Sequence, residues 1–216
     1  MQDHQFMTHA LALGRRNQGQ CWPNPAVGCV IVKEGRVVSR GWTAIGGRPH
    51  AEAQALKRAG ALAAGATAFV TLEPCAHQGQ TGPCCDALIA AKVARVVIGA
   101  ADPDPRVAGR GVAALKAAGI EVIEGVEVEA AAWDHAGFFN RILHGRPHIA
   151  LKMAASFDGK SAMENGESQW ITGPLARRWV HGMRARYDAI LVGGGTVRRD
   201  NPNLTVRDIG IERQPV

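Results

Sequence analysis

The spacing of apolar residues predicts that helices and strands alternate along the chain. Short apolar runs with β-branched residues are typical of buried strands, and apolar positions three and four apart are typical of helices. The expected strands are 27–33, 36–42, 68–72, 95–99 and 121–124, and the expected helices are 3–18, 51–64, 111–118 and 127–141, with another helical run beginning at Cys84. Leu56 and Leu62 are expected on the buried stripe of the second helix. This order predicts a mixed sheet with helices on its faces, a three-layer α/β/α sandwich.

A second pattern of elements follows residues 144–147, whose Gly-Arg-Pro sequence we interpret as a domain boundary. The expected elements beyond it are strands at 149–154 and 189–192, a helix from near Pro174 to Arg186, and a glycine run at 193–195. Proline is tolerated in the first turn of a helix because its missing N–H would have no partner there. We therefore divide the chain into domains at 1–145 and 146–216.

The charge of the chain narrows the range of partners. The formal charge is +6 at pH 7 and the sequence pI is about 9.4, which is a possible sign of nucleic-acid binding. The arginines, however, are scattered instead of forming a block. Aromatic residues make up 5% of the chain, few for a platform on which bases stack. We therefore predict a small-molecule substrate and no nucleic-acid partner.

Location is predicted from three features of the sequence. The N-terminal residues MQDHQ lack the basic and apolar regions of a secretory signal. There is no run of about 18 apolar residues, so no membrane span is expected. Five cysteines, an odd number, argue against a disulfide framework and for a reducing cytoplasm. Cys29 lies inside an apolar run and is predicted to belong to the core.

One histidine, two cysteines and a glutamate form the chemical centre of the first domain. His50 begins the sequence His-Ala-Glu, Cys75 follows a predicted strand, and Cys84 begins a predicted helix. An imidazole and two thiolates form a zinc ligand set that leaves the fourth tetrahedral position open. Zinc lowers the pKa of a bound water to about 7. We predict these three residues as the zinc ligands and Glu52 as the catalytic residue that carries protons.

Other interpretations of this centre are left open by the residues alone. Cys85 is the nearest competing ligand, although it lies one position further into the predicted helix. Ordinary buried side chains and a structural zinc module are also possible, but neither interpretation gives Glu52 a role. A position at a helix N-terminus is expected to lower the pKa of the Cys84 thiol.

The spacing of the two cysteines resembles that of one family of zinc deaminases. Cys84 lies nine positions after Cys75, and residues 71–84, TLEPCAHQGQTGPC, resemble the riboflavin-biosynthesis pyrimidine deaminases. Residues 24–32, NPAVGCVIV, resemble the first signature of that family. The resemblance implies a cytidine-deaminase-like fold over roughly residues 1–145 and substrate contacts at Asn24 and His77.

Two loop residues depart from the pattern of this family. Gln80 stands where the relatives usually have Lys or Arg, and Asp104 stands where they usually have Asn. Both loops are expected to meet the phosphoribosyl part of the substrate. The departures therefore concern how the phosphate is bound and not how the amine is hydrolysed.

The second domain resembles the reductase half of the same bifunctional riboflavin enzymes, whose fold is like that of dihydrofolate reductase. The resemblance rests on residues 152–159 (KMAASFDG), 168–170 (SQW) and 196–202 (TVRRDNP). It implies NADPH contacts at Ala154, Trp170, Thr196 and Asp200, and substrate contacts at Ser168, Arg184, Leu204 and Arg207. The glycine run would let backbone amides approach a pyrophosphate, or it is simply a turn between a strand and a helix.

The second domain is short for a reductase of that family, because 69 residues run from His148 to Val216. We expect a partial domain with poor order after about Arg207 and no reductase activity from this chain. The resemblance implies zinc-dependent deamination of diaminohydroxyphosphoribosylaminopyrimidine. In a complete protein, NADPH would then reduce the ribosyl group of 5-amino-6-(5-phosphoribosylamino)uracil.

We also expect the protein to be a cytoplasmic homo-oligomer. A tRNA adenosine deaminase or a free cytidine deaminase is the alternative activity. The long loop between Cys75 and Cys84 and the second-domain motifs argue against both of them.

Overall fold

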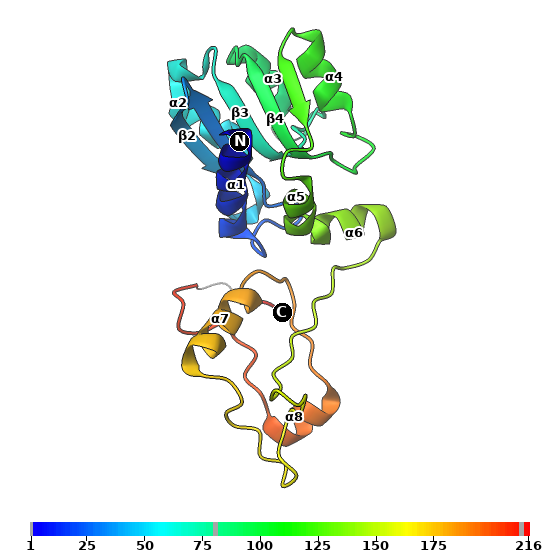
Figure 1. Cartoon of the computed structure of the whole chain (residues 1–216). Coiled ribbons are helices and arrows are strands. Elements are labelled where there is room, and N and C mark those ends of the chain that lie inside the picture. Colours follow the sequence, from blue (N-terminus) through cyan, green and yellow to red (C-terminus); the bar gives the residue numbers. More distant parts are fainter. Residues whose placement is uncertain (1, 80–81, 212–213) are drawn as a thin grey trace. The chain divides into compact units, whose positions relative to one another are not determined.

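The computed structural model describes residues 2–79, 82–211 and 214–216 (Figure 1). It divides into two compact units, Met1–His148 and Ile149–Val216. The boundary predicted after residue 145 lies close to this division.

The first unit is built on a five-stranded mixed sheet. Its strands are β1 (Gly28–Lys33), β2 (Arg36–Trp42), β3 (Thr67–Leu72), β4 (Arg95–Ala100) and β5 (Glu121–Glu124), in the spatial order β2-β1-β3-β4-β5. β1 runs antiparallel to both of its neighbours, whereas β3, β4 and β5 run parallel. The carboxyl ends of β3 and β4 therefore meet at one edge of the sheet, where ligand sites of open α/β sheets usually form.

Helices cover both faces of this sheet. They are α1 (Gln2–Gly14), α2 (Ala51–Ala59), α3 (Cys84–Ala90), α4 (Arg110–Ala117), α5 (Val128–Asp134) and α6 (Ala136–His144), with short 3₁₀ turns at 15–17, 45–47 and 60–63. α1 and α5 contact one face, and α2, α3 and α4 form the layer on the other (Figure 1). The predicted three-layer α/β/α arrangement is confirmed.

Two glycines let helices approach the sheet closely. A Cβ atom on Gly28 of β1 would lie 1.8 Å from the Ala10 carbonyl oxygen of α1. A Cβ atom on Gly41 of β2 would lie 2.1 Å from the Ala51 carbonyl oxygen of α2. Because Ala51 follows His50 directly, the second contact fixes the start of α2 against the sheet. Cys29, predicted in the core, is fully buried between these layers.

The structure differs from the sequence prediction in three helices of this unit. The helix predicted at 3–18 ends at Gly14 and continues as a 3₁₀ turn at 15–17. The helix predicted at 127–141 is broken at His135, which joins α5 to α6 and is buried against Phe139 and Thr71. The helix predicted at 51–64 ends at Ala59 and continues as a 3₁₀ turn. Leu62 lies in that turn and is exposed, so its predicted place on the buried stripe is wrong.

His135 should make the stability of the first unit depend on pH. Burial lowers the pKa of this imidazole to about 4, against about 6.5 in an unfolded chain. The unfolded chain therefore binds more protons between these values, and stability falls as the pH drops from about 6.5 towards 4.

We expect protonation of His135 to lower the free energy of unfolding by on the order of 2–3 kcal/mol over that range. His135→Gln should not show this loss. Urea unfolding of both proteins at pH 7.5 and pH 5 measures it. Equal losses on acidification in the two proteins would show that other groups cause the loss.

The second unit holds two helices, α7 (Pro174–Arg184) and α8 (Gly194–Asp200). Its described residues form no β-strand, so the strands predicted at 149–154 and 189–192 are wrong. A strand requires a partner for its backbone groups, and the apolar side chains of Ile149, Leu151 and Met153 are exposed here. Of the predicted glycine run, Gly193 precedes α8, and Gly194 and Gly195 form its first turn.

The C-terminal residue is paired with the segment before α8. The backbone N–H of Val216 donates to Asp188 O, and the N–H of Ile190 donates to Val216 O, both at 2.9 Å. Part of the stretch predicted to be poorly ordered, residues 212–213, lies outside the described residues. In the part of the chain that is described, no helix is long and apolar enough to cross a membrane.

Candidate active site

His50, Cys75 and Cys84 converge from three different segments. His50 is the extended residue that precedes α2, Cys75 lies in the loop after β3, and Cys84 is the first residue of α3. His50 Nδ1 lies 3.4 Å from Cys84 Sγ and 3.7 Å from Cys75 Sγ. The three ligand atoms lie within 4.8 Å of one another.

These distances fit a tetrahedral zinc ion. Zinc–sulfur bonds of about 2.3 Å and zinc–nitrogen bonds of about 2.0–2.1 Å in a tetrahedron place nitrogen and sulfur about 3.6 Å apart. The two observed nitrogen–sulfur distances lie on either side of this value. Three protein ligands are also the number found in catalytic zinc sites, because the fourth position must admit water or substrate.

The structure places Cys84, and not Cys85, in this group. The backbone N–H of Cys84 donates to Cys75 Sγ at 3.3 Å. The Cys85 thiol contacts Asp86 Oδ1 at 3.5 Å instead, and burial raises its pKa to about 11. Cys85 still supports the site through its backbone, since its N–H donates to Cys75 O at 3.2 Å.

The pKa values of the Cys75 and Cys84 thiols are shifted in opposite directions. Hydrogen bonds from the Cys84 thiol and from His50 lower the pKa of Cys75 to about 4, against the opposing effect of burial. The pKa of Cys84 is raised by its hydrogen bond to Cys75 and by burial. The lowering predicted for Cys84 from its helix position is therefore wrong, because proximity to a second sulfur outweighs the short helix α3.

Glu52 lies in the first turn of α2 and is buried. Burial raises the pKa of its carboxyl, while His50 and a hydrogen bond with Cys84 oppose the shift. Its contact with the Cys84 thiol places the carboxyl beside the three candidate ligands. A buried carboxyl with a raised pKa at such a position can both accept and return a proton near neutral pH.

Glu73 organises the loop that carries Cys75. Its carboxylate is buried and accepts hydrogen bonds from four backbone N–H groups. The donors are Asp102 at 3.4 Å, Gly109 at 3.1 Å, Gly111 at 3.1 Å and Val112 at 3.3 Å. A Cβ atom on Gly111 would lie 2.1 Å from Pro74 O, so α4 begins directly against the Pro-Cys segment.

Glu73→Ala should destabilise this edge of the sheet strongly. The change leaves buried backbone N–H groups without acceptors, and we expect a loss of at least about 3 kcal/mol. Urea unfolding measures the loss, and Glu121→Ala, which removes an exposed glutamate, is the matched control. A Glu73→Ala protein as stable as the control would mean that these four bonds do not hold the loop.

The predicted substrate residues Asn24 and His77 lie on separate loops of the first unit. Asn24 Nδ2 donates to Gly47 O at 2.9 Å, in the segment that leads into His50. A Cβ atom on Gly79 would lie 3.9 Å from His77 Nε2 and 3.1 Å from Arg48 Nη2. His77 and Arg48 therefore border the Cys75–Cys84 loop. Gln80, the departure from the family pattern that falls in this loop, lies outside the described residues.

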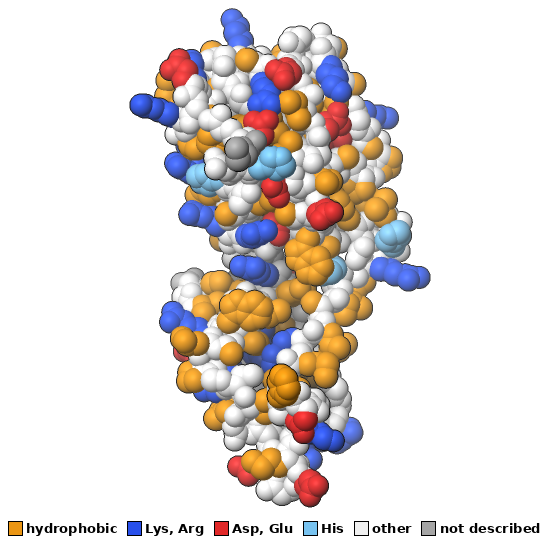
Figure 2. All heavy atoms as spheres, in the orientation of Figure 1, with side chains coloured by type: hydrophobic (Ala, Val, Ile, Leu, Met, Phe, Trp, Pro, Cys, Tyr) orange, Lys and Arg blue, Asp and Glu red, His pale blue; other side chains and the backbone are white. Residues whose placement is uncertain are grey.

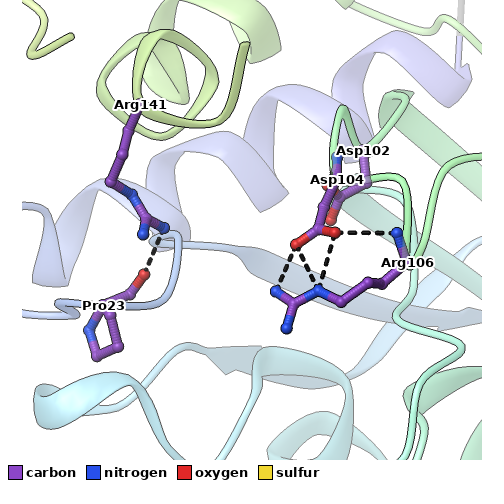
Figure 3. Close-up of polar contacts among 5 residues, drawn as sticks. All are labelled: Pro23, Asp102, Asp104, Arg106 and Arg141. Atoms are coloured by element: carbon purple, nitrogen blue, oxygen red, sulfur yellow. Dashed lines mark hydrogen bonds and ion pairs between the residues drawn. The ribbon is translucent and has the colours of Figure 1, made fainter. Parts of the chain in front are cut away.

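Two aspartates follow β4. Asp102 is buried beyond the end of the strand, and burial raises its pKa to about 6. The N–H of Asp104 donates to Asp102 Oδ1 at 2.8 Å. Arg106 donates to both carboxylate oxygens of Asp104 (Figure 3) and holds the pKa of that carboxyl below its usual value. Asp104 thus carries its charge in a pair with an exposed guanidinium.

The predicted residues of the second unit are gathered only in part. Arg184 Nη1 donates to Thr205 O at 3.2 Å, and Arg207 Nη1 donates to Thr205 Oγ1 at 3.1 Å. These two predicted substrate residues therefore lie together, with Leu204 beside them in sequence. Burial and the charge of Arg207 lower the pKa of Arg184.

The predicted cofactor residues of this unit are spread over three segments. Ala154 lies in the extended segment after residue 149, Trp170 stacks under Arg177 at 4.1 Å, and Thr196 and Asp200 lie on α8. Among the described residues, no hydrogen bond or ion pair joins Ala154, Trp170 or the predicted substrate residue Ser168 to the others.

Asp102 and Glu73 were not identified from the sequence. A usable signal existed for Asp102, since it follows β4 as Cys75 follows β3, and parallel strands bring their carboxyl ends together. Glu73 stands between an apolar strand and a proline, which marks a turn but not an acceptor of four N–H groups.

Two family models match the chain. The cytidine and deoxycytidylate deaminase zinc-binding region matches residues 1–100, and the RibD C-terminal domain matches residues 147–216. Together with the geometry of the His/Cys/Cys group, the first match identifies a zinc-binding deaminase region.

Sequence relatives and solved structures match nearly the whole chain. The riboflavin biosynthesis protein RibD of Escherichia coli (strain K12) is 53% identical over 99% of this chain and 58% of that protein. The crystal structure of a diaminohydroxyphosphoribosylaminopyrimidine deaminase/5-amino-6-(5-phosphoribosylamino)uracil reductase from Thermotoga maritima has a TM-score of 0.91 at 44% identity. It is matched over 99% of this chain and 61% of its own.

A structure of RibD from Acinetobacter baumannii has a TM-score of 0.84 at 48% identity, over 97% of this chain and 59% of its own. These matches confirm the predicted cytidine-deaminase-like α/β fold. The chain spans about three fifths of the length of the relatives it matches.

Proposed function

The chain belongs to the RibD family of riboflavin-biosynthesis proteins, and from that premise we propose that its first unit is a zinc-dependent pyrimidine deaminase. The observation that carries the proposal is the group of His50, Cys75 and Cys84 at zinc-binding distances, with the buried carboxyl of Glu52 beside it. The proposed substrate is the one in the name of the Thermotoga maritima relative, diaminohydroxyphosphoribosylaminopyrimidine.

The reaction is a hydrolysis that needs no oxidant. A ring carbon gains oxygen from water and loses its exocyclic amine as ammonia. When bound at His50, Cys75 and Cys84, a zinc ion supplies the Lewis acidity that makes hydroxide available near neutral pH. Glu52 takes up the proton released by the water at its carboxylate and hands it to the departing amine. Burial of Glu52 excludes bulk water from this transfer.

The side chains around the centre suggest how the substrate is held. Asn24 and His77, on loops next to the candidate ligands, would contact the pyrimidine and the ribosyl group. In place of the usual Asn, Asp104 presents a carboxylate paired with Arg106. Arg48, which borders the Cys75–Cys84 loop, and Arg106, which is paired with Asp104, would supply positive charge toward the phosphate.

For the second unit we propose a contribution to NADPH-dependent reduction. The match of residues 147–216 to the RibD C-terminal domain supports this. Arg184 and Arg207 would bind the phosphoribosyl group, and Ala154, Trp170, Thr196 and Asp200 would contact the cofactor. NADPH oxidation coupled to ammonia release tests this contribution.

A panel of substrates tests the proposed reaction. Ammonia release is measured with the zinc-loaded chain on the phosphoribosyl pyrimidine, on free cytidine and on tRNA. We expect turnover of the first alone. On the face shown in Figure 2, Lys and Arg side chains are spread out with Asp and Glu among them, unlike a continuous basic track for RNA. Adenosine-to-inosine conversion in tRNA, falling steeply with salt, would overturn the proposed substrate.

A further inference from the structure

Arg141 of α6 makes three contacts with groups around the Asn24 loop. Its Nη2 donates to the backbone oxygen of Pro23 at 2.9 Å (Figure 3). Its guanidinium carbon lies 4.9 Å from the ring centroid of Trp22 and 5.5 Å from that of Phe138. The guanidinium is thus stacked near an aromatic ring of its own helix and one of the loop, and it is bonded to the residue before Asn24.

The same loop is tied on its other side to the segment that leads into His50. The N–H of Gly46 donates to Gln20 O at 2.8 Å. Asn24 Nδ2 donates to Gly47 O at 2.9 Å, and the N–H of Asn24 donates to Cys21 O at 2.8 Å. Residues 20–24 are therefore held between α6 and the 44–47 turn, three residues before the first candidate ligand.

We propose that Arg141 is a positioning residue that sets the place of Asn24 in the deaminase site. This inference rests on the proposed function, because it concerns how the substrate is held there. A planar guanidinium suits the task, since it can stack on an aromatic ring and donate in its own plane at the same time. Arg141 acts through the loop and does not itself touch the reacting atoms.

Arg58 provides a matched control on a different element. It stacks on Trp42 at 4.9 Å and donates to a backbone oxygen, that of Arg40, at 2.6 Å. These are the same kinds of contact that Arg141 makes, but they join α2 to β2 and leave the Asn24 loop untouched. Arg58→Ala therefore shows how far the loss of such contacts, away from the Asn24 loop, changes the amide exchange of Asn24 and Gly46.

Amide hydrogen exchange tests the positioning without any assay of activity. In Arg141→Ala the amides of Asn24 and Gly46 should exchange about tenfold faster, because a hydrogen bond from a charged donor no longer restrains the loop. Arg141→Lys keeps the charge but not the plane, and should restore protection only in part. Unchanged protection of both amides in Arg141→Ala, or equal acceleration in Arg58→Ala, would overturn the proposal.

A double-mutant cycle tests whether Arg141 works through Asn24. Arg141→Ala should raise KM about tenfold, with kcat changed by less than about twofold and zinc content unchanged. In an Asn24→Ala background the same change should add nothing further to KM. Additive effects would assign Arg141 a role apart from Asn24 and overturn the inference while the proposed function stands. A wild-type chain that releases no ammonia would overturn the proposed function, and hydrogen exchange would then decide this inference.

Discussion

Glu52→Gln is expected to remove most of the deamination while leaving the fold and the zinc in place. Glutamine has nearly the same shape as glutamate but cannot take up and return the proton of the attacking water. General acid–base groups contribute roughly 10²–10⁴-fold, so kcat should fall by about that factor. Single-turnover ammonia release with zinc-loaded protein is the measurement, and metal content is determined on the same sample.

The control for Glu52 is an exposed glutamate in the same place on another helix. Glu129 lies in the first turn of α5, as Glu52 lies in the first turn of α2, and it is exposed. Glu129→Gln should keep the activity of the wild type. If Glu52→Gln also kept near-full turnover with its zinc bound, another group would have to carry the proton.

Replacing either candidate thiolate ligand should remove the metal. Cys75→Ser and Cys84→Ser are each expected to lower zinc affinity more than about 100-fold, since even outer-shell changes cost 10–100-fold. Deamination should be lost with the metal and should not return on adding zinc at micromolar concentrations. Competition with a chromogenic chelator measures the affinity.

The adjacent Cys85 supplies the matched control for these substitutions. It is buried next to Cys84, but its thiol faces Asp86, so Cys85→Ser should keep both zinc and activity. A Cys85→Ser protein without zinc, together with a Cys84→Ser protein that retains it, would show that Cys85 is the zinc ligand and Cys84 is not.

The strands of the first unit could be predicted because the buried strands coincide with short apolar runs in the sequence. β2 and β5 are observed with their predicted bounds, and β1, β3 and β4 differ by one residue at one end. The grouping of His50, Cys75 and Cys84 was predictable for a related reason. A ligand set leaves fixed residue types in sequence, and the loop after a parallel strand brings them to one edge.

Other features depend on contacts that a linear pattern does not encode. The break at His135 follows from a buried contact with Thr71 on β3, 64 residues away. The raised pKa of Cys84 follows from Cys75, which arrives from another segment. In the second unit the apolar stretch at 149–154 has strand-like composition, but a sheet also needs partners, and the described residues form none.

X-ray absorption at the zinc edge of the purified, zinc-loaded chain tests whether His50, Cys75 and Cys84 hold a catalytic zinc. We predict one zinc per chain with two sulfur ligands at about 2.3 Å and two nitrogen or oxygen ligands at about 2.0–2.1 Å. One of these lighter ligands would be His50, and the other would occupy the position left open for chemistry. A shell of three or four sulfurs, or the absence of stoichiometric zinc, would contradict a catalytic site at His50, Cys75 and Cys84.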